Sequence, residues 1–187
     1  MKTLPLFAAA LLAFSAPALA DDAKPLIAVV NIQNIMKDSA VSKSVREQLE
    51  KKQESFQADF SKKEEQLKKE DQELGKQRNV LAKEAFEEKA SAFRKKVTET
   101  QKDAEYKKMI LNNAANTSYA EIQKNISDIV AGLAKEKGFQ VALRMEAPPA
   151  WQVLYADPKL DITDEVLSRL NKQLPKISVK FDAPAKK

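Results

Sequence analysis

The residue types that most often carry out covalent chemistry are missing from this chain, which contains no Cys and no His. Thiol nucleophiles, Cys-ligated zinc and imidazole general bases are therefore excluded by inventory. The glycines Gly75, Gly132 and Gly138 lie too far apart to form a loop that binds phosphate through its backbone amides. We therefore predict a protein that is not an enzyme and that binds no cofactor and no metal ion.

Two pairs of neighbouring carboxylates are the remaining arrangement that resembles a general acid and its base. Asp161 and Asp164 precede an apolar stripe at helical spacing, so capping of a helix N-terminus explains them. Glu64 and Glu65 lie in a strongly charged stretch, where a solvated helix surface explains them. Neither pair indicates catalysis.

Binding of other macromolecules is the second kind of chemistry, and it concerns cations and phenylalanines between residues 56 and 94. Acidic residues are interspersed among the cations, which indicates either a solvated helix surface with i,i+4 ion pairs or capture of acidic polypeptides or an anionic membrane surface. The phenylalanines indicate either a helix–helix seam or contacts with a bound polypeptide. The candidate contact residues are Phe56, Phe60, Lys76, Arg78, Lys83, Phe86, Lys89, Phe93 and Arg94.

Long helices must position these residues, because no proline occurs between Pro25 and Pro148. Apolar residues recur at spacings of four and seven over residues 45–81, and a second stripe with mostly three–four spacing covers residues 86–133. Half of the first stripe is polar in its outer part. This pattern predicts two helices that cover each other through a thin seam.

We predict an antiparallel coiled-coil hairpin arm over residues 39–137 that turns near residues 80–84. Ser39 or Ser42 is suited to cap the first helix, and Gly138 to end the second. The alternative is one continuous helix of about ninety residues, because no Gly or Pro marks the turn.

Short β-rich segments flank the arm and form a predicted body from residues 21–38 and 138–187. Apolar runs at 26–32, 139–145 and 151–155 predict strands, and residues 161–174 predict a final helix. Alternating residues at 177–181 suggest an edge strand. The fold class is therefore α+β, mainly α.

This body is too small to be stable alone, so we expect it to oligomerise through its sheet. The residues assigned to its core or to the oligomer interface are Ile27, Val29, Phe139, Val141, Leu143, Leu154 and Tyr155.

Residues 1–20 have the features of a cleaved secretory signal peptide. Lys2 precedes an apolar run at residues 4–14, and Ala18-Leu19-Ala20 forms a small-residue cleavage site. A transmembrane anchor is the alternative, but the run is shorter than the roughly 20 residues needed to span a bilayer. Removal of Lys2 leaves 31 basic and 27 acidic residues, a net charge of +4, without the concentrated basic patch of a nucleic-acid-binding protein.

The order of elements and several local motifs resemble the Skp/OmpH family of periplasmic chaperones. The most specific segment is Val-Leu-Tyr-Ala-Asp-Pro at residues 153–158, followed by Leu-Asp-Ile-Thr-Asp-Glu-Val-Leu at 160–167. The Ala-Val-Val-Asn-Ile segment at 28–32 and residues 134–141 add to the similarity. The resemblance covers residue 27 to about residue 174, and residues 146–151 depart from the family pattern with a longer turn between strands.

The resemblance implies a homotrimer in the periplasm whose three arms enclose a cavity that holds unfolded outer-membrane proteins without ATP. It also implies a link to lipopolysaccharide or another anionic lipid surface, which the residues do not localise. A thin seam suits such holding, because many weak contacts on adaptable arms act together. The alternative is a rigid coiled-coil spacer of the cell envelope that binds no client.

Overall fold

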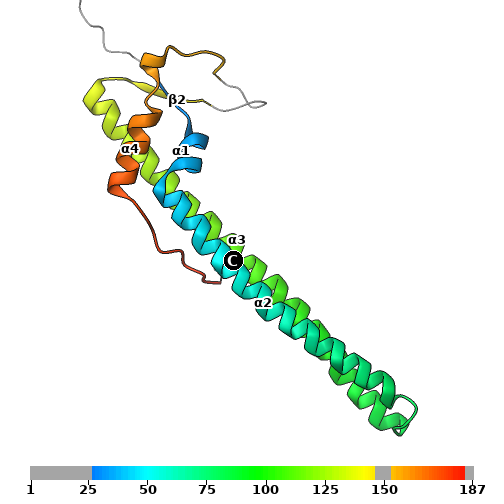
Figure 1. Cartoon of the computed structure of the whole chain (residues 1–187). Coiled ribbons are helices and arrows are strands. Elements are labelled where there is room, and N and C mark those ends of the chain that lie inside the picture. Colours follow the sequence, from blue (N-terminus) through cyan, green and yellow to red (C-terminus); the bar gives the residue numbers. More distant parts are fainter. Residues whose placement is uncertain (1–26, 146–152, 184–187) are drawn as a thin grey trace, which may run out of the picture.

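The computed structural model describes residues 27–145 and 153–183, and it consists of a long helical hairpin with a small body at its open end (Figure 1). The predicted signal peptide, residues 21–26 of the body and the 146–151 turn lie outside the described residues. In chain order the elements are strand β1 (Ile27–Val30), helices α1 (Ile32–Asp38), α2 (Ala40–Gln77) and α3 (Lys83–Lys137), strand β2 (Val141–Arg144), the 3₁₀ turn η1 (Pro158–Leu160) and helix α4 (Thr163–Gln173).

Helices α2 and α3 form the predicted antiparallel hairpin, which excludes a single continuous helix. Ser39 caps α2 by accepting a hydrogen bond from the backbone N–H of Ser42 at 3.3 Å. The connection over residues 78–82 overlaps the predicted turn. Gly138 ends α3 with a φ of 82°, a left-handed conformation that favours glycine.

Packing differs sharply between the base of the hairpin and the rest of the arm. At the base, α2 buries Val41 and Val45 against a row of α3 residues that includes Ile122, Ile126 and Leu133. Within the hairpin between Val45 and residue 114, every described residue except Ala90 is at least partly exposed. The thin outer seam is therefore real, and the core lies where the hairpin meets the body. None of the described helices is long and apolar enough to cross a membrane.

Strands β1 and β2 pair in parallel, with a register that runs from Ile27 opposite Val141 to Val30 opposite Arg144. Parallel neighbours need a crossover connection, and here the whole hairpin provides it. The other edge of β1 is covered where the Ile162 amide donates to the Val29 carbonyl at 3.0 Å. The segment before the arm, through β1, is therefore hydrogen-bonded on both of its edges to the segment that follows the arm.

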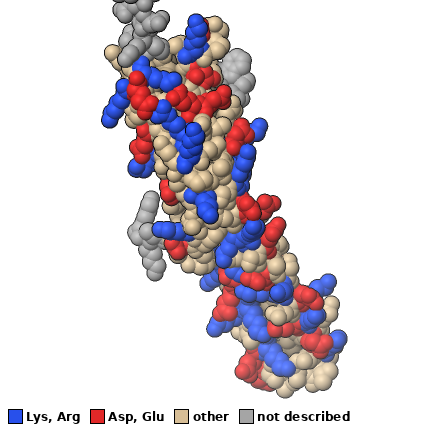
Figure 2. Space-filling model, turned by 60° about the vertical axis from the view of Figure 1, so that its left-hand side comes forward, with Lys and Arg blue, Asp and Glu red and all other residues tan. Residues whose placement is uncertain are grey.

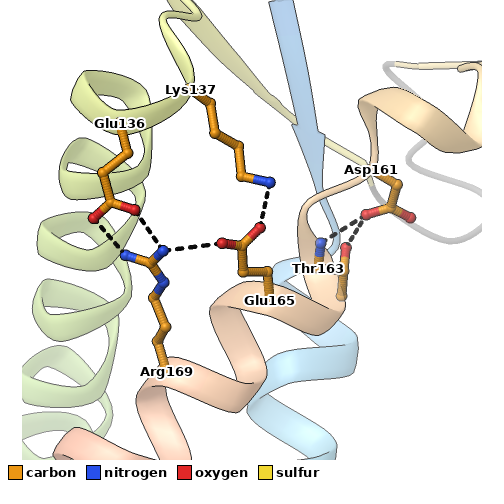
Figure 3. A network of polar contacts seen from close by, with 6 residues as sticks. All are labelled: Glu136, Lys137, Asp161, Thr163, Glu165 and Arg169. Carbon is orange, nitrogen blue, oxygen red and sulfur yellow. Dashed lines mark hydrogen bonds and ion pairs between the residues drawn. The ribbon is translucent and has the colours of Figure 1, made fainter.

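Helix α4 packs against the end of α3 and α1, with Val166 and Leu170 fully buried. The guanidinium of Arg169 donates to both oxygens of Glu136 at 2.7 and 2.6 Å and also to Glu165 at 3.0 Å. Lys137 completes the network by pairing with Glu165 at 2.6 Å (Figure 3). This network fixes the C-terminal helix to the end of the arm.

Four local expectations need correction. Residues 153–155 form no strand, and the contact with the second edge of β1 is the single bridge between Val29 and Asp161. Residues 177–181 form no edge strand but lie extended on the hairpin. The N-cap position of α4 is Ile162, one residue later than predicted, but Asp161 still supplies the capping hydrogen bond, because its carboxylate accepts from the backbone N–H of Thr163 at 2.8 Å and also from its hydroxyl. The separate helix α1 was not predicted, because its seven residues follow the strand too closely to show a helical period.

Candidate functional site

The four phenylalanines expected at the arm are half-buried, so each lies in the seam and also presents part of its ring to solvent. Phe56 and Phe60 extend from α2, and Phe86 and Phe93 from α3. An aromatic ring that is fully inside a seam would be buried, as the aliphatic residues at the base are. The two sequence-based interpretations, seam and binding surface, are therefore compatible at these positions.

Two shallow hollows adjoin three of these rings, because the narrow seam leaves space between α2 and α3, whereas Phe86 lines neither hollow. The inner hollow, of about 450 Å³, is lined by Phe56, Phe60 and Leu111 together with the stem of Lys107 and polar neighbours. The outer hollow, of about 340 Å³, contains Leu74 and Phe93. Both hollows join an apolar floor to a charged rim, which is the composition that binds an amphipathic chain segment.

The five cations predicted to contact a partner fall into two groups. Lys76 pairs with Glu73 at 2.6 Å, and Lys89 donates to the side-chain oxygen of Gln77 at 2.7 Å. In the described part of the chain, the remaining three form no ion pair: Arg78 and Lys83, which are exposed at the hairpin turn, and Arg94, which is exposed about three turns into α3. The end of the arm therefore presents cations that are available to a partner, interspersed with Glu84, Glu87 and Glu88, which are also exposed and form no ion pair within the described residues.

Ion pairs link α2 to α3 along the arm where apolar contacts are sparse. Glu70 accepts from Lys96 at 2.8 Å, and Asp103 accepts from Lys63 and lies 3.3 Å from Lys107. The hydrogen bond from Lys63 holds the pKa of Asp103 below its usual range. Acidic and basic side chains alternate over the face in Figure 2, so the arm carries both signs of charge and no single-sign patch on that face.

Exposed apolar residues that the sequence interpretation missed also lie on the arm. Val80, in the hairpin turn, is 81% exposed, and Tyr106 and Met109 are exposed on α3. The sequence feature that could have revealed these exposed residues is an apolar residue at a position out of register with both apolar stripes. Val80 places an apolar contact beside the cations of the arm end.

The body residues predicted as core or interface divide between these two environments. Val29 and Phe139 are buried in the core, whereas Ile27, Val141 and Leu143 are exposed. The last two predicted residues are also exposed: the relative accessibility is 80% for Leu154 and 81% for Tyr155. Within the described residues β2 has no strand on its second edge, so an unpaired edge and an apolar surface occur together.

The described residues contain no group of three or more acidic side chains placed to hold a metal ion. The arrangement on the arm is suited to reversible contact with a flexible polypeptide, because it offers many partial apolar and charged sites and no enclosed pocket.

Comparison with known proteins gives a consistent assignment. The family model for OmpH-like outer membrane proteins matches residues 26–170. The crystal structure of a proposed outer membrane chaperone (OmpH-like) from Caulobacter crescentus CB15 is 17% identical, covers 95% of each chain and superposes with a TM-score of 0.73. No curated protein sequence matches the chain. Because the family match covers well over half of the sequence, this chain belongs to the OmpH-like family, as the sequence motifs indicated.

Proposed function

We propose that this protein is a periplasmic holding chaperone that binds unfolded outer-membrane β-barrel proteins and prevents their aggregation without ATP. The observation that carries this proposal is the arm seam, where half-buried phenylalanines line shallow hollows with polar rims. The rim of the outer hollow carries both signs of charge, and that of the inner hollow carries lysines and amides. An unfolded barrel segment alternates apolar and polar side chains, and such hollows accommodate both. The protein is accordingly not an enzyme.

The holding state is a homotrimer in this proposal. The body of residues 21–38 and 138–187 supplies the contacts between subunits, and residues 39–137 supply the arms. The exposed face of Ile27, Val141 and Leu143 beside an unpaired strand edge supports this arrangement, because a two-stranded sheet is marginal in water. Three arms on one body raise the effective concentration of weak sites around a client.

Positive charge at the arm end provides the first encounter with an acidic client or with an anionic lipid surface, lipopolysaccharide included. Arg78 and Lys83 are exposed there, Arg94 is exposed about three turns along α3, and none of the three forms an ion pair within the described residues. Long-range attraction increases the rate of association and weakens as salt increases. Release of the client needs no nucleotide, since each contact is weak and separately reversible.

An aggregation assay tests the proposal. A urea-unfolded outer-membrane β-barrel protein is diluted into buffer with or without the mature protein, at low and high salt, with and without ATP. We expect light scattering to be suppressed, ATP to have no effect, and native mass measurement to show a complex of one trimer with one client. A trimer that leaves aggregation unchanged would instead support the envelope-spacer alternative.

A variant pair connects this activity to the hollows. Phe60→Ala combined with Phe93→Ala removes one ring from each hollow, so we expect weaker suppression while circular dichroism shows the helices intact. Tyr106→Ala is the matched control, because it removes an exposed aromatic ring of α3 that lines neither hollow. Equal activity of both variants would place the client contacts elsewhere.

A further inference from the structure

The C-terminal tail, residues 175–183, leaves α4 and runs in an extended conformation along the hairpin, seen as the red segment in Figure 1. Val179 is only 9% exposed and belongs to the hydrophobic core, and Ile177 and Phe181 pack against that core. Ser178 and Lys180 between them are exposed. The tail therefore binds the hairpin as a strand-like segment with one apolar face and one polar face.

Gln48 of α2 recognises the backbone of this tail through both atoms of its amide. Its Nε2 donates to the Ile177 carbonyl at 2.8 Å, and its Oε1 accepts from the Val179 amide at 3.1 Å. A neighbouring β-strand would satisfy the same pair of backbone groups, two residues apart. Nε2 also donates to the Ser44 carbonyl at 3.1 Å, which holds the amide in this orientation. These Gln48 hydrogen bonds contact only backbone atoms of an extended segment, so they do not depend on which side chains that segment carries.

Side chains beyond Gln48 continue the same surface toward the arm. The Lys52 ammonium lies 5.5 Å from the centre of the Phe181 ring and 4.8 Å from that of Phe56. Asn113 of α3 donates to the Asp182 carbonyl at 3.4 Å. Phe56 is also one of the two phenylalanines that line the inner hollow, so the tail surface and that hollow meet at this residue.

We propose that the surface formed by Gln48, Lys52 and Phe56 is a binding site for extended polypeptide segments with alternating apolar residues, and that the tail is its built-in occupant, which a client strand displaces. This inference rests on the proposed holding function and names a specific client-binding site. Alternation with an aromatic residue at one end is the pattern of an outer-membrane β-strand, and residues 177–181 have that pattern.

The tail lies beyond the part of the chain that the family model matches, which ends at residue 170. Being tethered, it competes at a high effective concentration and lowers the affinity of the site for a segment in trans. The tail therefore limits the site to clients that contact several arm surfaces at once, and it covers the apolar surface when no client is bound.

Full-length variants that release the tail test the competition. The probe is a fluorescent peptide with the sequence of residues 176–182, Lys-Ile-Ser-Val-Lys-Phe-Asp. Val179→Asp, alone and with Phe181→Asp, places a charge on the buried face, so we expect the peptide to bind at least about tenfold more tightly than to the unchanged protein. The matched controls carry the same new residue on the exposed face: Ser178→Asp, alone and with Lys180→Asp.

Addition of Gln48→Glu to the Val179→Asp variant removes the side-chain N–H that would donate to the peptide carbonyl equivalent to that of Ile177. Peptide binding should therefore be lost again. The proposal is overturned if neither tail variant binds the peptide while circular dichroism shows intact helices. It is also overturned if the exposed-face controls bind as tightly as the buried-face variants, or if Gln48→Glu has no effect.

The same variants are then titrated with a urea-unfolded β-barrel protein. We expect both buried-face variants to bind this client more tightly than the unchanged protein does. An unchanged client affinity alongside tighter peptide binding would overturn the role of the site in client binding. If neither the unchanged protein nor any variant binds the barrel protein, the proposed holding function is wrong. Peptide binding to the surface formed by Gln48, Lys52 and Phe56 is measured separately and still tests the competition by the tail.

Discussion

At the residue scale, hydrogen-bonded ion pairs connect elements where apolar contact is limited. Glu165 accepts from Lys137 of α3 and from Arg169 one turn along its own helix. The hydrogen bond from Lys137 is the largest cause of a pKa of Glu165 below the ordinary value of 4.5, and Arg169 lowers the pKa of Glu136 in the same way. These groups couple the docking of α4 to pH.

The sign of this coupling follows from proton binding. Because the folded-state pKa of Glu165 is below 4.5, the unfolded chain binds more protons in the interval between the two values. The stabilising contribution is therefore present above the unfolded-state pKa and is lost as pH falls through the folded-state pKa. We expect Glu165→Gln to lower the melting temperature at about pH 7 and to have a smaller effect at about pH 3.

Melting curves followed by circular dichroism across this pH range check the prediction. Glu64→Gln is the control, because Glu64 is exposed on α2 and forms no ion pair within the described residues. This control should follow the unchanged protein at every pH. If Glu165→Gln lowers the melting temperature equally at both pH values, the lost contribution is steric and not ionic.

At the element scale, helix α3 belongs to two environments. Its C-terminal third packs Ile122, Ile126 and Leu133 into the core, whereas its first half covers α2 only partly. Local stability depends on buried apolar contact, so the outer arm should open more readily than the base. This gradient permits an arm that adapts to a client while its base keeps its position on the body.

The two glycines near the end of α3 should respond in opposite directions to alanine. A Cβ at Gly132 meets no atom within 4 Å, so Gly132→Ala should stabilise the helix by about 1 kcal/mol. Gly138 has a φ of 82°, so Gly138→Ala should destabilise the protein by about 1–2 kcal/mol. Urea unfolding of both variants measures these differences, and a stabilising Gly138→Ala would contradict the left-handed end of the helix.

At the scale of the whole molecule, the arm projects far beyond the body, and the body exposes apolar residues. Ile27, Val141 and Leu143 are exposed beside a strand edge that is unpaired among the described residues. Burial of apolar surface contributes about 25 cal/mol per Å², so association through this face offsets the small core of one subunit. The body is therefore the place where subunits should meet.

A charged residue in this face should disrupt the assembly. We expect Leu143→Glu to lower the mass measured by light scattering from that of an oligomer to that of one subunit, because it leaves a carboxylate in an apolar interface. Val80→Glu is the matched control, since Val80 is an exposed apolar residue in the hairpin turn, at the opposite end of the arm. If Leu143→Glu keeps the full mass, the interface uses another surface.

The local elements with a strong period could be predicted from the sequence. The apolar stripes predicted both long helices, Gly138 marked the end of the second, and Ser39 was one of the two serines predicted to cap the first. The first two strands were recognisable as short β-branched or alternating runs. These features depend on neighbours within one turn or one strand, which is why a single chain reveals them.

The structure was needed wherever the partner of a segment lies far away in the chain. Residues 177–181 have the alternation of a strand, but their backbone pairs with the side chain of Gln48, so no strand forms. The division of the phenylalanines between seam and surface also depends on how closely α2 approaches α3. The sequence by itself determined the helices, their thin seam and the family, because these depend on local period and residue order. Only the tertiary structure decided which apolar faces are covered and by what, because burial is set by residues that are distant in sequence.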